Sequence, residues 1–128
     1  QFVVTVDARM DEIYWAKYQF SPSANEPQRL GAIHLSSPEE INLSDAQYLA
    51  GSAINVYGNR LFTLHQLPVD CLDADIGVSA LGVLSYAISA LVSGKQISVQ
   101  ELEPLYVRNK VALTTEEREQ IFKKNTQE

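Results

Sequence analysis

The stretch VDARMDEIYWAKY, residues 6–18, crowds four charged side chains into its first seven residues. Its composition predicts two strands joined by a turn, and the turn carries Asp7, Arg9, Asp11 and Glu12. Closely spaced carboxylates are candidates for chemistry, and the arginine between them can form a local ion pair, although an exposed pair contributes only about 0–1 kcal/mol. The turn is therefore either a solvated loop or a contact through which Asp7 and Arg9 face a neighbouring domain or a partner.

A second candidate is QYLAGSAINVYG, residues 47–58, in which an apolar run is followed by Gly51, Ser52 and a predicted helix. Such a backbone can approach a phosphate group, with free N–H groups at the helix start, so Gly51 and Ser52 are candidate nucleotide-binding residues. A tight turn between a strand and a helix needs the same residues, and a single glycine favours that interpretation. Ser52 lacks the Gly-x-Ser-x-Gly flanks of a hydrolase nucleophile.

We predict no catalytic residue, no metal site and no cofactor. His34 and His65 are far apart and belong to no metal-binding spacing. Cys71 is close in sequence to Asp70, Asp73 and Asp75, and neighbouring carboxylates oppose thiolate formation, which is the reverse of what a nucleophile needs.

The composition describes one ordinary globular domain. The 128 residues are 45% hydrophobic and 20% charged, with a net charge of −6. This acidic balance makes the domain a poor candidate for direct nucleic-acid binding. A single cysteine excludes a disulfide within the chain and is typical of a reducing compartment, so we expect a cytoplasmic protein. The chain opens at Gln1 directly into an apolar run, from which we expect a piece of something longer.

The first part of the chain is predicted to form a strand meander. Residues 2–6 and 13–20 are rich in β-branched and aromatic residues and are expected to pair as an antiparallel hairpin. Residues 21–28 are a loop by their Pro, Ser and Asn content, and residues 29–35 form a third strand. A Ser-Pro-Glu-Glu pattern at residues 37–40 starts a short helix.

The second part is predicted to be mainly helical. The apolar run 47–50 precedes a helix over residues 54–64, and residues 67–75, with Pro68 and three aspartates, form an irregular connection. Residues 76–93 form a long helix that ends at Gly94. Residues 97–99 form a short strand, residues 101–113 begin extended because Pro104 disfavours helix before it, and residues 114–128 form a C-terminal helix or a frayed tail.

The nineteen residues 76–94, which include the long helix, carry no charge, and this length is close to the ~20 that a bilayer crossing needs. Its serines and glycines dilute its hydropathy, and acidic residues precede it, so we interpret it as a buried core helix covered on most sides. Ser85, Ser89 and Ser93 lie at i, i+4 and i+8 and form a stripe of small residues that lets another element approach closely.

Two stretches together resemble one family. VDARMDEIYWAKYQ, residues 6–19, is similar to the DAR-x-x-E-x-Y hairpin of the TsaB family, also called YeaZ, and LEPLYVRNKVA, residues 102–112, is similar to its P-x-Y-x-R-N terminal segment. The resemblance spans nearly all of this chain and about half of the family's protein, so residues 1–113 correspond to its C-terminal lobe. The N-terminal lobe is not in this sequence.

The resemblance implies an α/β (mixed α+β) lobe of the ribonuclease-H-like, actin-like ATPase type, in which an antiparallel strand meander is followed by helices packed on the sheet. It implies a non-catalytic scaffold subunit of the complex that forms N6-threonylcarbamoyladenosine at position 37 of tRNAs reading ANN codons. The paralogue TsaD carries the chemistry, TsaE joins the assembly, tRNA is contacted only indirectly, and the full-length protein can form a homodimer. Pairing with TsaD runs mainly through the missing lobe.

Matching motif positions mark Asp7, Arg9, Arg108 and Asn109 as residues that brace the lobes against each other or against a partner. The sequence departs from the family at Gly51, which is a single glycine where the family has a glycine-rich turn, and at Asp11, where glycine is common.

The alternative function is a nucleotide-binding or peptidase-like enzyme of the glycoprotease-like group in which this family is often filed.

Overall fold

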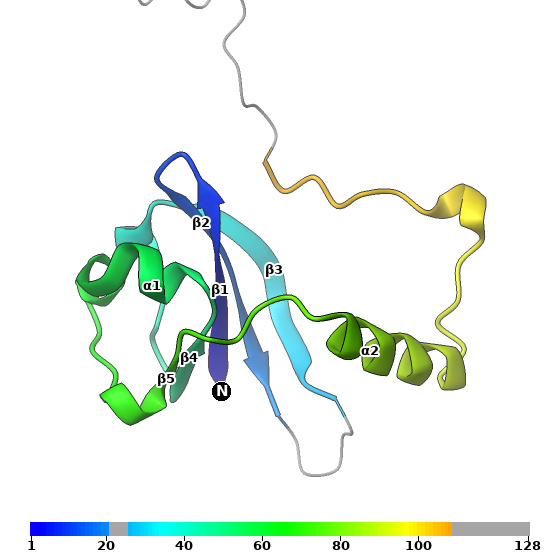
Figure 1. Ribbon diagram of the computed structural model, residues 1–128, viewed down its shortest axis with the longest axis horizontal. Helices are drawn as coiled ribbons and strands as arrows, with labels where there is room; N and C mark the ends of the chain where they lie inside the picture. The colour runs from blue at the N-terminus through cyan, green and yellow to red at the C-terminus, as the bar shows by residue number, and fades with distance from the viewer. Residues whose placement is uncertain (21–25, 109–128) are drawn as a thin grey trace, which may run out of the picture.

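The computed structural model describes residues 1–20 and 26–108, which form a five-stranded mixed sheet flanked by helices (Figure 1). The strand order is β3-β2-β1-β4-β5, in which β1, β2 and β3 are antiparallel neighbours and β4 and β5 run parallel to β1. The strands are β1 (Phe2–Arg9), β2 (Glu12–Gln19), β3 (Gln28–Ser36), β4 (Tyr48–Ala50) and β5 (Leu72–Asp73). The predicted meander is confirmed.

The alternation of residues along β1 and β2 gives the sheet two unlike faces. Val3, Thr5, Ile13 and Trp15 point to one face and are buried, whereas Val4, Val6, Tyr14 and Tyr18 alternate with them on the other. The register places Thr5 opposite Trp15 and Val6 opposite Tyr14, and an irregularity lies between Asp7 and Arg9.

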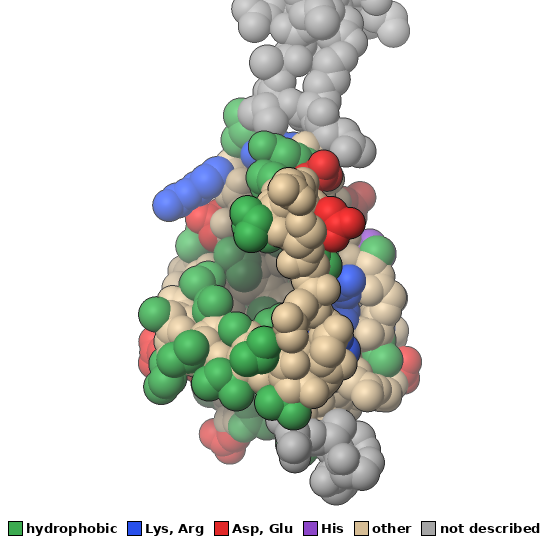
Figure 2. All heavy atoms as spheres, turned by 90° about the vertical axis from the view of Figure 1, so that its right-hand side faces the viewer, with side chains coloured by type: hydrophobic (Ala, Val, Ile, Leu, Met, Phe, Trp, Pro, Cys, Tyr) green, Lys and Arg blue, Asp and Glu red, His purple; other side chains and the backbone are tan. Residues whose placement is uncertain are grey.

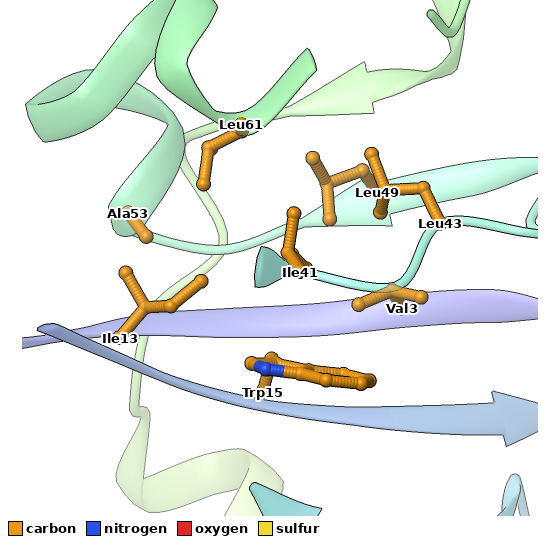
Figure 3. Packing of buried hydrophobic residues seen from close by; sticks show 8 residues of the cluster. All are labelled: Val3, Ile13, Trp15, Ile41, Leu43, Leu49, Ala53 and Leu61. Atoms are coloured by element: carbon orange, nitrogen blue, oxygen red, sulfur yellow. The ribbon is translucent and has the colours of Figure 1, made fainter. Parts of the chain in front are cut away.

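The hydrophobic core lies on the first of these faces (Figure 3). Side chains from the sheet meet side chains from the segment after β3 and from the first helical region. Its buried members are Val3, Ile13, Trp15, Ile41, Leu43, Leu49, Ala53 and Leu61. Burial of these apolar groups is the main force that holds the first helical region to this face.

The first helical region is shorter than predicted. The predicted start at Ser37 is a single 3₁₀ turn, Pro38–Glu40, with a capping box in which Glu40 reaches back to the Ser37 N–H. The helix predicted over residues 54–64 is α1 (Ala53–Tyr57), followed by a 3₁₀ helix, Gly58–Phe62. The backbone of Gly58, with φ +49°, ends the α-helical geometry.

Two further predictions are wrong. The connection over residues 67–75 contains the two-residue strand β5, which pairs with β4. The strand predicted over residues 97–99 is instead a 3₁₀ turn, Val99–Glu101, because the Ser98 and Glu101 side chains cap its backbone reciprocally.

The long helix is α2 (Ala80–Val92), capped by Ser79 and followed by Gly94 with φ +69°. It lies on the opposite side of the sheet from α1 (Figure 1). The prediction that it is buried is wrong for the described chain, since its large apolar side chains are 54–83% exposed. None of the helices in the described ranges combines the length and the hydropathy of a transmembrane segment.

Several predictions fall outside the described residues. They are most of the loop at residues 21–28, Asn109, the end of the extended segment and the C-terminal helix at residues 114–128. Residues 102–108 are described and have no helix or strand, as Pro104 indicates.

Gly51 fixes the approach of the loop after β4 to β1. Its φ is +122°, and a Cβ there would lie 1.9 Å from the carbonyl oxygen of Thr5. Since real Cβ atoms do not approach backbone this closely, only glycine fits here.

We therefore expect Gly51→Ala to lower the free energy of unfolding by about 3 kcal/mol or more, because backbone strain and overlap both oppose the added methyl group. Urea denaturation followed by the fluorescence of the buried Trp15 measures this loss. Gly31→Ala is the matched control: φ is +83° but nothing lies within 4 Å, so a loss of about 1 kcal/mol is expected. Equal losses in the two variants contradict the packing role of Gly51.

Candidate functional site

The candidate site is the turn between β1 and β2, which has an unusual backbone for its residue types. Arg9, Met10 and Asp11 have φ values of 61°, 58° and 62°, so three successive non-glycine residues are left-handed. Arg9 pairs with Glu12 across the turn, which leaves Met10 and Asp11 as a two-residue connection. Such a turn normally uses Asn-Gly, and each left-handed L-residue costs roughly 1–2 kcal/mol. Side chains from elsewhere must therefore hold this turn.

Arg60, in the 3₁₀ helix after α1, holds the turn from one side. Its guanidinium donates to both carboxylate oxygens of Asp11, at 2.6 and 2.9 Å, and to Glu39 at 2.5 Å. The Tyr57 ring lies 5.5 Å from its Cζ atom. Hydrogen bonds from Arg60 lower the pKa of both carboxyls, and those carboxylates in turn raise the pKa of Arg60.

Arg108 holds the turn from the other side, about 100 residues along the chain. Its Nη2 donates to the carbonyl oxygens of Ala8 at 3.1 Å and Arg9 at 3.3 Å and forms an ion pair with Glu12. Only 14% of its side chain is exposed. One guanidinium thus binds two backbone carbonyls of β1 and a carboxylate of β2 at the same time.

Asp7 binds several groups where β1 enters the turn. Its carboxylate accepts the Arg9 N–H at 2.9 Å and the Tyr57 hydroxyl at 3.0 Å, and it forms an ion pair with the Arg9 guanidinium at 3.1 Å. The Arg9 N–H is the main cause that lowers the pKa of Asp7, and the Tyr57 hydroxyl adds to it. Burial, together with that carboxylate, raises the pKa of Tyr57.

The two candidate nucleotide-binding residues lie beside this turn and make contacts within the fold. Ser52 Oγ accepts the Asp7 N–H at 3.3 Å, and the Gly51 N–H donates to the carbonyl oxygen of Asp73 at 2.8 Å. That Gly51 N–H is therefore occupied in this structure, and α1 beyond it has only five residues. Nucleotide binding at Gly51 and Ser52 stays a prediction.

The other residues considered for chemistry lie away from the turn. His34 stacks on Trp15 with ring centroids 4.3 Å apart, His65 lies in an exposed segment, and Cys71 is half-buried. Within residues 1–20 and 26–108, no three His, Cys, Asp or Glu side chains gather as a metal ion requires.

The structure brings together three of the four predicted contact residues: Asp7, Arg9 and Arg108 meet at the turn, and Asn109 lies outside the described residues. Their contact role with another lobe or partner stays a prediction. The sequence reasoning missed Arg60, Tyr57 and Glu39, because a single arginine 49 positions from Asp11 carries no local signal of its partner.

Comparison with solved structures places this architecture beside known proteins. The chain is similar to an uncharacterized protein with similarity to peptidase YeaZ from Pseudomonas aeruginosa, with a TM-score of 0.67, 28% identity and coverage of 84% of this chain and 49% of that chain. It is similar to YeaZ from Pseudomonas aeruginosa with the same score and identity, over 82% of this chain and 49% of that chain. No family profile matches the chain, and no curated protein matches it significantly.

The chain therefore spans about half the length of the solved structures that it matches. The resemblance to the TsaB (YeaZ) family read from the two sequence motifs is confirmed by this likeness. The predicted fold class is confirmed as well, because the mixed five-stranded sheet with its helices matches the ribonuclease-H-like fold of a YeaZ lobe.

The turn's left-handed backbone predicts that Met10→Asn stabilises the protein. Asparagine tolerates this conformation better than methionine, so we expect the free energy of unfolding to rise by about 0.5–1 kcal/mol in urea denaturation. Leu64→Asn removes a side chain of similar size, 76% exposed, from a position without positive φ, and should change stability little. A destabilised Met10→Asn would show that the Met10 side chain, whose sulfur lies 3.3 Å from Arg108, matters more than the backbone.

The lowered pKa of Asp7 predicts acid sensitivity. A carboxylate whose pKa is lower in the folded chain stabilises the fold above its unfolded value of 3.8, and this contribution is lost as the pH falls through the folded value. Unfolding free energies measured from about pH 6 to pH 2 should therefore fall less steeply below about pH 4 in Asp7→Asn than in the parent. Asp70→Asn, at an exposed carboxylate outside the turn, should keep the parent's slope. An unchanged slope in Asp7→Asn would exclude a stabilising charge at Asp7.

Proposed function

We propose that this chain is the C-terminal lobe of a TsaB-like scaffold subunit in the cytoplasmic complex that forms N6-threonylcarbamoyladenosine at position 37 of tRNAs reading ANN codons. TsaD performs the transfer, TsaE joins the assembly, and this lobe contributes contacts rather than chemistry. The likeness to the YeaZ structures over most of the chain supports the proposal.

The main support for this proposed function is a contact between the two motif segments. The two segments that resemble the family motifs lie far apart in sequence, yet Arg108 of the second segment binds the carbonyls of Ala8 and Arg9 in the first. Chance similarity in two short stretches gives no reason for the stretches to meet in space. Their meeting supports a common structural role for the motif residues.

Within this site, Arg9 is the group best placed to meet another surface. Its side chain is 86% exposed, whereas Asp7 is 11% exposed and Arg108 is 14% exposed. We assign to Arg9 a charged contact with the other lobe or with TsaD, and to Asp7 and Arg108 the support of the turn that presents it. Charged contacts of this kind give orientation and specificity more than raw affinity.

The enzyme alternative has less support. One of the similar structures is a protein with similarity to peptidase YeaZ. A serine or cysteine nucleophile needs an adjacent base, but the Ser52 hydroxyl is bonded to the Asp7 backbone and His34 is stacked on Trp15. The net charge of −6 also favours indirect contact with tRNA through partners.

The proposal predicts that TsaD of the same organism is retained by the full-length polypeptide containing this chain. We expect Arg9→Glu to weaken retention about tenfold, equivalent to about 1.4 kcal/mol, with no loss of folding in thermal denaturation. Arg29→Glu makes the same charge change on β3, away from the turn, and should leave retention unchanged.

Two outcomes would oppose the proposal. Equal retention of TsaD by both arginine variants would remove Arg9 from the interface. Failure of the parent polypeptide to retain TsaD, combined with hydrolysis of ATP or a peptide by that polypeptide alone, would favour the enzyme alternative.

A further inference from the structure

Met10 lies at the tip of the β1–β2 turn and is the one methionine of the sequence. The residue is 66% exposed, and its backbone is left-handed, with φ +58°. Its sulfur nevertheless lies 3.3 Å from Nη1 of Arg108, whose side chain is only 14% exposed. Met10 is therefore open to a dissolved reactant and in contact with a largely buried cation at the same time.

The Arg108 guanidinium is better satisfied on one side than on the other. Nη2 donates to the carbonyl oxygens of Ala8 and Arg9 and pairs with Glu12. Nη1 donates to the Met10 sulfur, and Nε is buried without a hydrogen-bond partner among the described residues. A thioether is a weak acceptor, whereas guanidinium N–H groups are strong donors. A stronger acceptor in place of the sulfur would therefore be bound more tightly.

Oxidation by a peroxide produces such an acceptor from the methionine itself. A lone pair of the sulfur attacks hydrogen peroxide, so an S–O bond forms and the O–O bond breaks, and two electrons pass from sulfur to the peroxide. The leaving hydroxide takes up the proton of the transferred oxygen and becomes water. The product is a sulfoxide with a polar oxygen, and the three rotatable bonds of the side chain let this oxygen turn toward the guanidinium.

We propose that Met10 is a reversible oxidation site and that its sulfoxide tightens the hold of Arg108 on the β1–β2 turn. A sulfoxide in an apolar core disrupts packing. Met10 is instead exposed and faces a cation, so the new oxygen gains a charge-assisted hydrogen bond and displaces no packed neighbour.

The same contact controls the extended segment that ends at Arg108. Leu105 and Val107 of this segment border a cavity of about 350 Å³ on the open face of the sheet, which is the face opposite the core. The residues of the sheet that line this cavity include Val4, Val6, Tyr14 and Tyr18. Figure 2 shows hydrophobic side chains gathered around a hollow on this side of the molecule. A tighter hold on Arg108 therefore restrains both the charged turn and the segment beside the open face.

Peroxide treatment of the full-length polypeptide containing this chain tests the proposal. We expect peptide mass spectrometry to find one added oxygen at Met10, and the two stereospecific types of methionine sulfoxide reductase to remove it together. In the oxidised protein, the backbone amides of residues 8–13 should exchange with deuterium about threefold to tenfold more slowly, because the turn opens less often.

Two substitutions separate the hydrogen bond from other effects of oxidation. Met10→Gln places a carbonyl oxygen near the position of the sulfoxide oxygen, whereas Met10→Leu has a similar size and no acceptor. Neither substitution relieves the left-handed backbone. We expect Met10→Gln to slow exchange at the turn without peroxide, and Met10→Leu to show no slowing with or without it. Arg108→Lys keeps the positive charge but lacks Nη1, so peroxide should no longer slow exchange in that variant.

Three results would overturn the proposal. The first is no oxygen at Met10 under conditions that oxidise the urea-unfolded chain. The second is exchange at the turn that is unchanged or faster in the oxidised parent and in Met10→Gln. The third is a peroxide-induced slowing that persists in Met10→Leu or in Arg108→Lys. No readout involves TsaD, so failure here is distinguishable from failure of the proposed function.

Discussion

The contact between Arg108 and the β1–β2 turn is the interaction on which the described structure most depends. Three successive residues of this turn have positive φ, and the Arg108 guanidinium donates to the carbonyl oxygens of Ala8 and Arg9 beside it. A turn fixed in this way fixes the pairing of β1 with β2. Since a shift of one residue would exchange the two faces of a strand, the same contact keeps Val3 in the core and Val4 on the open face.

The open face is a consequence of this register. The sheet has enough apolar side chains to bury both surfaces, but α1 and the 3₁₀ turns cover only one of them. Arg108 also anchors the extended segment before it, which lays Leu105 and Val107 along the second surface. The extended segment that stabilises the turn through Arg108 therefore also borders the open face of the sheet.

Local sequence signals predicted the elements whose causes are local. Alternation gave β1, β2 and β3, and the Ser37 and Gly94 signals gave a helix start and a helix end. Local sequence signals failed to predict elements whose structure depends on a residue distant in sequence. The strand β5 is only two residues long, and it forms by pairing with β4. Arg60 reaches Asp11 only through the fold, and the periodicity of α2 indicates that it is apolar without indicating what covers it.

Gly51 shows why the site was harder to predict than the fold. A small residue before a helix is compatible with a phosphate-binding turn and with a tight packing contact, and the sequence alone does not distinguish the two. In the structure the missing Cβ admits the Thr5 carbonyl, and the Gly51 N–H donates to the Asp73 carbonyl, so the fold uses both the small size of this residue and its N–H group. The charged turn differs. Arg60 pairs with Asp11 and Glu39, and Arg108 pairs with Glu12. Arg9 pairs with Asp7 but keeps most of its side chain in solvent. The ion pairs of this network fix the turn that carries the exposed Arg9. Such an arrangement suits recognition, because a preorganised surface cation orients a binding partner.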